Sequence, residues 1–240
     1  MSEKKSSPRP EPPPLALPPG TWVLACKVFA PELEYLGVPP EQLSYLDQGL
    51  HRTPQRLRRE LEKTLAELER EHSPRRIVLV YGYCGGGLEG ISCRRAELVV
   101  PLAHDCIPVL LGGSCPTMGQ GGIFYLSAGW IDHGRTPLTE YHRTAERWGE
   151  EDALWVAHQI MKGYDRVALI ESPCTRDGHY LEHTREMADI YEMQVVRLPS
   201  DLGWIKRLLE CKPGPGVAII PPGQAIGLEM FQGAPSAAAL

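Results

Sequence analysis

The chain has 240 residues, of which 42% are hydrophobic, and a formal net charge of −5 with acidic and basic residues interspersed. This length suffices for one large domain or two smaller ones, and the charge argues against a nucleic-acid partner or a polybasic membrane patch. No segment reaches the roughly 18 apolar residues that span a bilayer, so a cytoplasmic protein without a membrane partner is expected. The seven cysteines, spread along the chain, favour thiol or metal chemistry over a disulfide framework.

The N-terminal segment is predicted to be a disordered tail. Residues 1–20 are rich in proline, with charged and small residues between, and cannot bury enough apolar surface to become ordered. The first strand is predicted at residues 22–25 and delivers Cys26 at its carboxyl end. A second short strand is predicted at residues 43–46.

A long helix follows the second strand. Thr53 and Pro54 mark its start, because threonine is a good cap and proline suits the first helical position. The helix is predicted to run to about Arg70, which leaves His51 in the loop between strand and helix. Its apolar face is formed by four leucines at helical spacing, Leu57, Leu61, Leu65 and Leu68.

The rest of the chain alternates between strands and helices. Asp105 is a natural cap for a short helix, Gly149 is predicted to break a long one, and the residues after Gln224 are expected to be frayed. The predicted strands are 77–81, 98–102, 123–126, 167–170, 195–198 and 217–220, and the predicted helices are 106–111, 140–162, 180–191 and 202–209.

This alternation predicts an α/β fold with parallel sheets flanked by helices and joined by right-handed crossovers. The break at residues 134–137 suggests two Rossmann-like lobes, an N-terminal lobe at residues 21–135 and a C-terminal lobe at residues 136–230, with the site between them. One continuous sheet is the alternative.

A glycine-rich loop with one cysteine follows the third strand. It reads Tyr-Gly-Tyr-Cys-Gly-Gly-Gly-Leu-Glu-Gly from Tyr81 to Gly90. Glycine backbone can approach a bound group closely, which makes Cys84 a candidate site residue. Gly85, Gly86 and Gly87 could cradle an anion or cofactor on their backbone N–H groups, although a tight turn around a small buried thiol explains the same pattern.

Several cysteines and histidines fall just after predicted strands. In open α/β sheets, ligands bind outside the carboxyl ends of the strands, so these side chains are expected to converge. The residues are Cys26, His51, Cys84, His104, Cys106, His133 and Cys174. The remaining cysteines and histidines, His142, His179 and His183 among them, are interpreted as packed or solvated residues.

Thiolates and imidazoles suit a transition metal such as zinc or iron, or an iron–sulfur cluster. The predicted metal ligands are Cys26, His51, Cys84 and Cys106. The alternative uses Cys84 as a nucleophile activated by His51 or His104. Asp105 would cap the helix or hold the orientation of an imidazole.

These motifs together resemble an uncharacterised domain-of-unknown-function family of anaerobic bacteria and methanogenic archaea, whose members often lie near corrinoid methyltransferase genes. The resemblance covers about residues 21–223. It implies that the family's recurring polar positions correspond to Cys26, His51, Cys84, His104, Asp105 and Cys106, whereas Cys93, Cys115, Cys174 and Cys211 do not obviously match. Leu102 departs from an arginine that the family tends to have before His-Asp-Cys. The motifs are Ala25-Cys26, Gly49–Pro54, Tyr81–Gly90, Ala103–Cys106, Leu111–Ser114 and Gly129–Ile131.

Two functions are therefore expected. The first is a metal- or iron–sulfur-binding protein that acts on a small-molecule or cofactor ligand in redox or methyl- and thiol-group chemistry. The second is a non-catalytic metal or cofactor carrier for a methyltransferase-system protein. Either requires that the sulfurs of Cys26, Cys84 and Cys106 lie within about 4 Å of one another around one ion.

Overall fold

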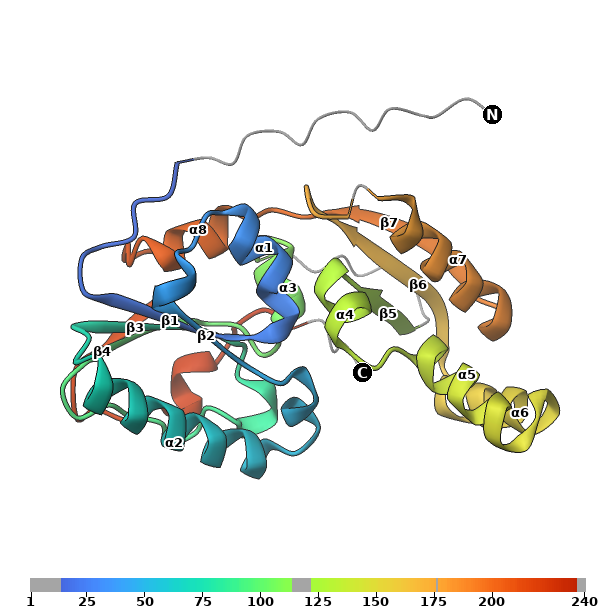
Figure 1. The fold of residues 1–240 in the computed structure, drawn as a ribbon, viewed down its shortest axis with the longest axis horizontal. Coiled ribbons are helices and arrows are strands. Elements are labelled where there is room, and N and C mark those ends of the chain that lie inside the picture. The colour runs from blue at the N-terminus through green and yellow to red at the C-terminus, as the bar shows by residue number, and fades with distance from the viewer. Residues whose placement is uncertain (1–13, 114–121, 176, 237–240) are drawn as a thin grey trace. The chain divides into compact units, whose positions relative to one another are not determined.

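The computed structural model describes residues 14–113, 122–175 and 177–236 (Figure 1). The chain divides into two compact units. The larger unit combines Leu15–Thr117 with Ser200–Leu240, and the smaller unit contains Met118–Pro199.

The sequence predicts two consecutive lobes, at residues 21–135 and 136–230, whereas the larger unit is built from two separate stretches of the chain. The chain leaves the larger unit once and later returns to it. Most of the predicted tail at residues 1–20 lies outside the described residues, and so does Cys115.

The larger unit is built on a five-stranded mixed sheet. Its strands are β1 (Thr21–Cys26), β2 (Leu43–Leu46), β3 (Arg76–Val80), β4 (Glu97–Pro101) and β8 (Val217–Ile220). Their spatial order is β2–β1–β3–β4–β8. The first four are parallel to one another, and β8 pairs antiparallel with β4. The carboxyl ends of β2, β1, β3 and β4 therefore meet at one edge of the sheet.

Helices cover both faces of this sheet (Figure 1). One face carries α2 (Pro54–Glu71), and the other carries α1 (Ala30–Tyr35), α3 (Cys106–Leu110) and α8 (Gly203–Leu209). Cover on both faces accounts for the full burial of the central strands. Short 3-10 helices lie between these elements at η1 (Lys27–Phe29), η2 (Pro40–Gln42), η3 (Gln48–Arg52), η4 (Cys84–Gly86) and η5 (Leu228–Phe231).

Helix α2 joins the sheet through the leucine face that the sequence predicts. Leu57, Leu61 and Leu65 are almost completely buried, in one cluster with residues of β1 and β3 such as Leu24 and Leu79. Burying each leucine contributes about 2 kcal/mol. This packing fixes the start of α2 beside the carboxyl edge of the sheet, where the glycine-rich loop also lies.

The smaller unit contains a three-stranded parallel sheet in the order β5–β6–β7. Helix α7 packs against β6 and β7, while α5 packs against α6 and α7. The strands are β5 (Gly122–Leu126), β6 (Tyr164–Glu171) and β7 (Gln194–Pro199), and the helices are α4 (Ala128–His133), α5 (Pro137–Trp148), α6 (Glu150–Ile160) and α7 (Gly178–Tyr191).

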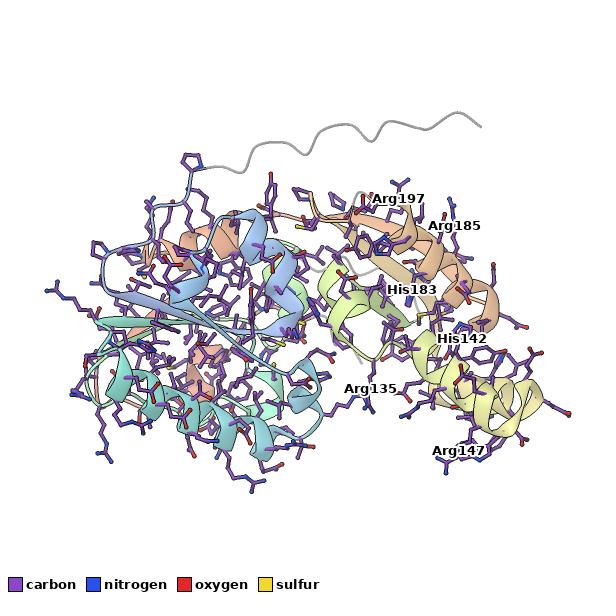
Figure 2. The ribbon with its side chains drawn as sticks, viewed as in Figure 1. Arg135, His142, Arg147, His183, Arg185 and Arg197 are labelled. Carbon is purple, nitrogen blue, oxygen red and sulfur yellow. The ribbon has the colours of Figure 1, made fainter. Side chains whose placement is uncertain are left out.

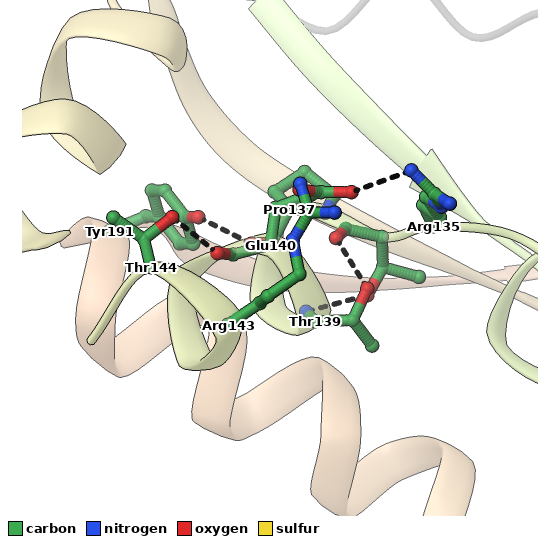
Figure 3. Close-up of polar contacts among 8 residues, drawn as sticks. Arg135, Pro137, Thr139, Glu140, Arg143, Thr144 and Tyr191 are labelled. Atoms are coloured by element: carbon green, nitrogen blue, oxygen red, sulfur yellow. Dashed lines mark hydrogen bonds and ion pairs between the residues drawn. The ribbon is translucent and has the colours of Figure 1, made fainter. Parts of the chain in front are cut away.

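The start of α5 is fixed by a cap and by the end of α7 (Figure 3). The Thr136 hydroxyl accepts a hydrogen bond from the Thr139 N–H at 3.3 Å, which satisfies an N–H group that the helix itself leaves unpaired. The Tyr191 hydroxyl donates to the Pro137 carbonyl oxygen at 2.8 Å. Arg135, just before the cap, pairs with Glu140 at 4.0 Å. The two helices are thus joined at a defined register.

The α/β fold class and all eight predicted strands are confirmed. The long helix predicted at residues 140–162 is divided at Gly149, whose φ of +93° ends α5. Helices α1 and α4 lie outside the predicted elements. Among the described residues, no helix combines the length and the apolar character that a membrane span requires.

Candidate functional site

The parallel strands of the larger unit bring several chemically capable side chains to one edge. Cys26 ends β1, Tyr81 follows β3, Cys84 lies three residues further on, and Asp105 follows β4. Cys26 and Cys84 both pack against the apolar cluster that contains Tyr81. Of the residues expected to converge, Cys26 and Cys84 thus pack against the same cluster.

Strand register explains why Cys26 and Tyr81 are neighbours. Ala25 pairs with Val80 in the parallel β1–β3 ladder, and the next position places Cys26 beside Tyr81. Cys26 also pairs with Leu46 of β2. Partners in a parallel sheet point to the same face, so all three side chains lie on the face that α2 covers.

The glycine-rich loop is shaped by close packing. A Cβ at Gly82 would meet the backbone of Asp105 at 2.4 Å, and one at Gly87 would meet Leu57 of α2 at 2.5 Å. Arg58 of α2 donates a hydrogen bond to the Gly86 carbonyl oxygen at 3.0 Å. The loop is thus held between α2 and the segment after β4, and this packing accounts for Gly82 and Gly87 without a ligand. Anion binding by Gly85, Gly86 and Gly87 stays a prediction.

Cys84 has an unusual backbone conformation for a side chain of its size. Its φ of +50° lies in the left-handed region, which costs a residue with a Cβ about 1–2 kcal/mol. Its N–H donates to the His104 carbonyl oxygen at 2.9 Å, and the N–H of Tyr83 donates to the Ala103 carbonyl oxygen at 2.8 Å. These bonds hold Cys84 against the β4–α3 segment in a strained conformation, which is characteristic of functional sites.

Burial and acidic neighbours keep both thiols protonated. Burial raises the pKa of Cys84 to about 12, and Cys26 and Asp105 raise it further, against a hydrogen bond from the Gly82 backbone. Burial likewise raises the pKa of Cys26 to about 11, with Asp47 adding to the effect and the Val28 backbone opposing it.

The β4–α3 segment contributes His104, Asp105 and Cys106. The Asp105 carboxylate accepts a hydrogen bond from the Ile107 N–H at 3.0 Å and caps α3, as predicted. Its other oxygen accepts from the Ser236 hydroxyl at 3.1 Å. Cys106 is the first residue of α3 and is half-buried.

His51 lies in η3, after β2. Its Nδ1 lies close to the Gln48 carbonyl oxygen, which can only accept, so Nδ1–H donates this hydrogen bond. A metal-binding histidine usually donates its other ring N–H to a carboxylate, a backbone carbonyl or water.

The chain beyond β8 closes over this part of the larger unit. Ile226 exchanges backbone hydrogen bonds with Ile91 and Gly90, and the His104 N–H donates to the Pro235 carbonyl oxygen at 3.0 Å. The Phe231 ring is completely buried against Tyr83, with ring centroids 4.7 Å apart. The expectation that residues after Gln224 are frayed is therefore wrong for the segment up to Ser236.

The full predicted ligand set is not assembled in the described residues. No group of three or more cysteine, histidine, aspartate and glutamate side chains among them is arranged to hold a metal ion. Coordination by Cys26, His51, Cys84 and Cys106 together therefore stays a prediction, and so do catalytic roles for Cys84, His104 and Asp105. None of the six described cysteines forms a disulfide.

The other candidates have different surroundings. His133 ends α4 and Cys174 follows β6, so both belong to the smaller unit. Cys93 is buried in the apolar cluster of the larger unit, and the Cys211 thiol donates to the Leu209 carbonyl oxygen.

The smaller unit gathers histidines that the sequence gives no reason to group. His142 of α5 pairs with Glu186 of α7 at 2.8 Å, and His183 Nε2 lies 3.0 Å from the Thr136 hydroxyl (Figure 2). Burial lowers the pKa of His183; His142 and His179 lower it further, whereas Glu186 raises it. Protonation of His183 thus places a charge beside the cap of α5.

We expect the smaller unit to lose stability on acidification. The unfolded chain binds a proton at His183 near its ordinary pKa of about 6.5, whereas the folded unit resists it until lower pH. The contribution of neutral His183 to the stability of the folded unit is complete above about pH 6.5. It is lost as the pH falls through the lowered pKa that His183 has in the folded state. Calorimetric melts at about pH 7.5 and 5.5 should show a smaller decrease for His183→Gln than for wild type. His158→Gln, at an exposed position of the same unit, should keep the wild-type decrease. Equal decreases in wild type and His183→Gln would rule out this origin.

Comparison with known proteins gives a family but no function. A family model described as "Protein of unknown function (DUF1638)" matches residues 45–209, more than half of the chain. The matched range includes the polar residues from His51 to Cys106, whereas Cys26 precedes it and the segment that closes over Tyr83 follows it. Neither the curated proteins nor the solved structures gave a match.

Proposed function

We propose that this chain, which belongs to the DUF1638 family, binds one soft transition-metal ion, zinc or iron, through the thiolates of Cys26 and Cys84. The bound ion would serve redox chemistry or the activation of a small thiol or methyl compound. The observation that carries the proposal is the placement of two half-buried thiols beside Tyr81 and Asp105 at the carboxyl edge of a parallel sheet.

Electrostatics favour a metal site over a cysteine nucleophile. The nucleophile is a thiolate, and reactive cysteines have a cation or a helix N-terminus nearby that lowers the pKa. Cys84 instead has Cys26 and Asp105 beside it, and its pKa is raised to about 12. A divalent ion provides the missing positive charge at the two sulfurs directly, because a coordinated thiol is deprotonated outright.

A third protein ligand would complete the site when the ion binds. Cys106 and His51 follow β4 and β2 at the same edge as Cys26 and Cys84, so a local adjustment of the β4–α3 segment or of η3 would bring one of them to the ion. A tetrahedral ion with three protein ligands keeps one position for a small molecule.

Titration of the anaerobically reduced protein with Co²⁺ tests the proposal. We expect one equivalent to bind and to give a sulfur-to-cobalt charge-transfer absorption. With thiol pKa values of about 11 and about 12, both sulfurs are protonated at neutral pH, so binding displaces two protons. The logarithm of the association constant should therefore rise by about two for each pH unit between about pH 6.5 and 8. Saturating Co²⁺ without a charge-transfer absorption, or an affinity independent of pH, would contradict thiolate coordination.

A further inference from the structure

The Tyr81 hydroxyl is a buried polar group whose hydrogen has no acceptor among the described residues. Tyr81 is 2% exposed, and the backbone N–H of Leu46, which can only donate, lies close to its oxygen. A buried hydroxyl without a partner lowers stability measurably, so its retention beside two thiols calls for an explanation. Phenylalanine would fill the same space at this position without that cost.

The ionisable side chains that act on the Tyr81 hydroxyl are the two cysteines, Cys26 and Cys84. Tyr81 lies beside Cys26 in the β1–β3 register, and both Cys26 and Cys84 pack against the cluster that contains it. The backbone group of Leu46 that lies close to the hydroxyl is a donor, so it offers no acceptor for the hydroxyl hydrogen. Protonated thiols are weak acceptors, whereas a thiolate is a charged and much stronger one.

The hydroxyl remains a donor at every relevant pH. Burial raises the pKa of Tyr81 well above its usual value, and the nearby Cys26 and Cys84 raise it further. The phenol therefore keeps its hydrogen and can donate it to a neighbouring group.

We propose that Tyr81 is a positioning residue whose hydroxyl donates a hydrogen bond to the ionised sulfur of Cys26 or Cys84 when these bind a metal ion. This inference rests on the proposed function and assigns it a further residue. The hydrogen bond holds the thiolate in the orientation that the ion requires and stabilises its charge. A strong acceptor for the Tyr81 hydroxyl exists only when one of the sulfurs is ionised. This accounts for a hydroxyl that has no acceptor while both thiols are protonated.

The test compares Tyr81→Phe with wild type in the anaerobic Co²⁺ titration. We expect the variant to bind one equivalent with an affinity about 10- to 100-fold weaker, the usual effect of losing a residue that orients a metal ligand. Its charge-transfer absorption should shift to lower energy, because a hydrogen bond lowers the energy of the sulfur electrons that are transferred. Without metal, its melting temperature should be unchanged or higher, since the change removes an unpaired hydroxyl.

Tyr45→Phe is the matched control. The Tyr45 hydroxyl is also buried and has no hydrogen bond in the described part of the chain, but Tyr45 pairs with Ala25, so its side chain points to the opposite face from Cys26. The charges near it are those of Glu34 and Glu32. Tyr45→Phe should leave the Co²⁺ affinity and the absorption energy unchanged.

The outcomes separate this inference from the proposed function. If wild type shows no thiolate-bound cobalt, the proposed function fails and the role of Tyr81 fails with it. If wild type binds cobalt through sulfur and Tyr81→Phe matches it in affinity and absorption energy, only the role of Tyr81 is overturned. A loss of affinity in both tyrosine variants would indicate a general effect on the sheet and would also overturn it.

Discussion

Replacement of Gly82 by alanine is expected to lower the free energy of unfolding by about 3 kcal/mol or more. A Cβ at this position would lie 2.4 Å from Cα and from the carbonyl carbon of Asp105 and 2.7 Å from its nitrogen. These are backbone atoms between β4 and α3, so no side-chain rotation can relieve the overlap. Chemical denaturation of the two proteins measures the difference.

The same substitution should also weaken the candidate site. Separation of Gly82 from Asp105 strains the bonds that hold Cys84 and Tyr83 against the β4–α3 segment. Gly214→Ala is the matched control in the larger unit, because its nearest neighbour would be the Arg207 side chain at 3.7 Å. That change should stay within about 0.5 kcal/mol of wild type. Equal stability of Gly82→Ala and wild type would show that the two loops are not in contact.

The double substitution Cys26→Ser, Cys84→Ser is expected to weaken Co²⁺ binding by much more than about 100-fold, which is the upper end of the effect of losing a residue that only orients a metal ligand. Both sulfur donors are lost, and serine hydroxyls are poor ligands for a soft ion. The charge-transfer absorption should disappear as well. Absorption-monitored titration measures both effects.

Cys211→Ser serves as the control for this pair. Cys211 lies in the same unit, and serine can keep its hydrogen bond to the Leu209 carbonyl oxygen. Its cobalt affinity and spectrum should match wild type. Unchanged cobalt binding in the Cys26→Ser, Cys84→Ser variant would show that the ion binds elsewhere and would refute the assignment of these two ligands.

The strands and the edge they define could be predicted from local pattern. β1 and β3 are short, mostly apolar runs that end in a cysteine and in the glycine-rich loop, and alternation along them decides which side chains face α2. The candidate residues Cys26 and Cys84 follow from this reasoning. Tyr81 could also have been predicted as a site residue, because the same alternation places its side chain on the face of the sheet that carries Cys26.

Other features depend on contacts that sequence spacing does not encode. Ile226 and Phe231 lie in a segment interrupted by glycines and prolines, and their contacts with Ile91 and Tyr83 contribute to its order. The reversed direction of β8 is likewise set by its pairing with β4. The histidine group of the smaller unit joins α5 to α7, which are separated by another helix and a strand.

The glycine-rich loop is a sequence pattern that fits two interpretations, a ligand-binding loop and a tightly packed turn. Its glycines allow another group to approach the backbone closely, but the sequence does not say whether that group is a ligand or another part of the chain. In the structure, Gly82 and Gly87 are approached by the Asp105 backbone and by Leu57. The strained residue of the loop is Cys84 rather than a glycine, which directs attention to its thiol.

X-ray absorption at the metal edge of the Co²⁺- or Zn²⁺-loaded protein identifies the atoms bound to the ion. We expect at least two sulfur scatterers at about 2.3 Å from a single ion, falling to none or one in the Cys26→Ser, Cys84→Ser variant. An ion surrounded only by nitrogen and oxygen at about 2.0–2.2 Å would contradict it.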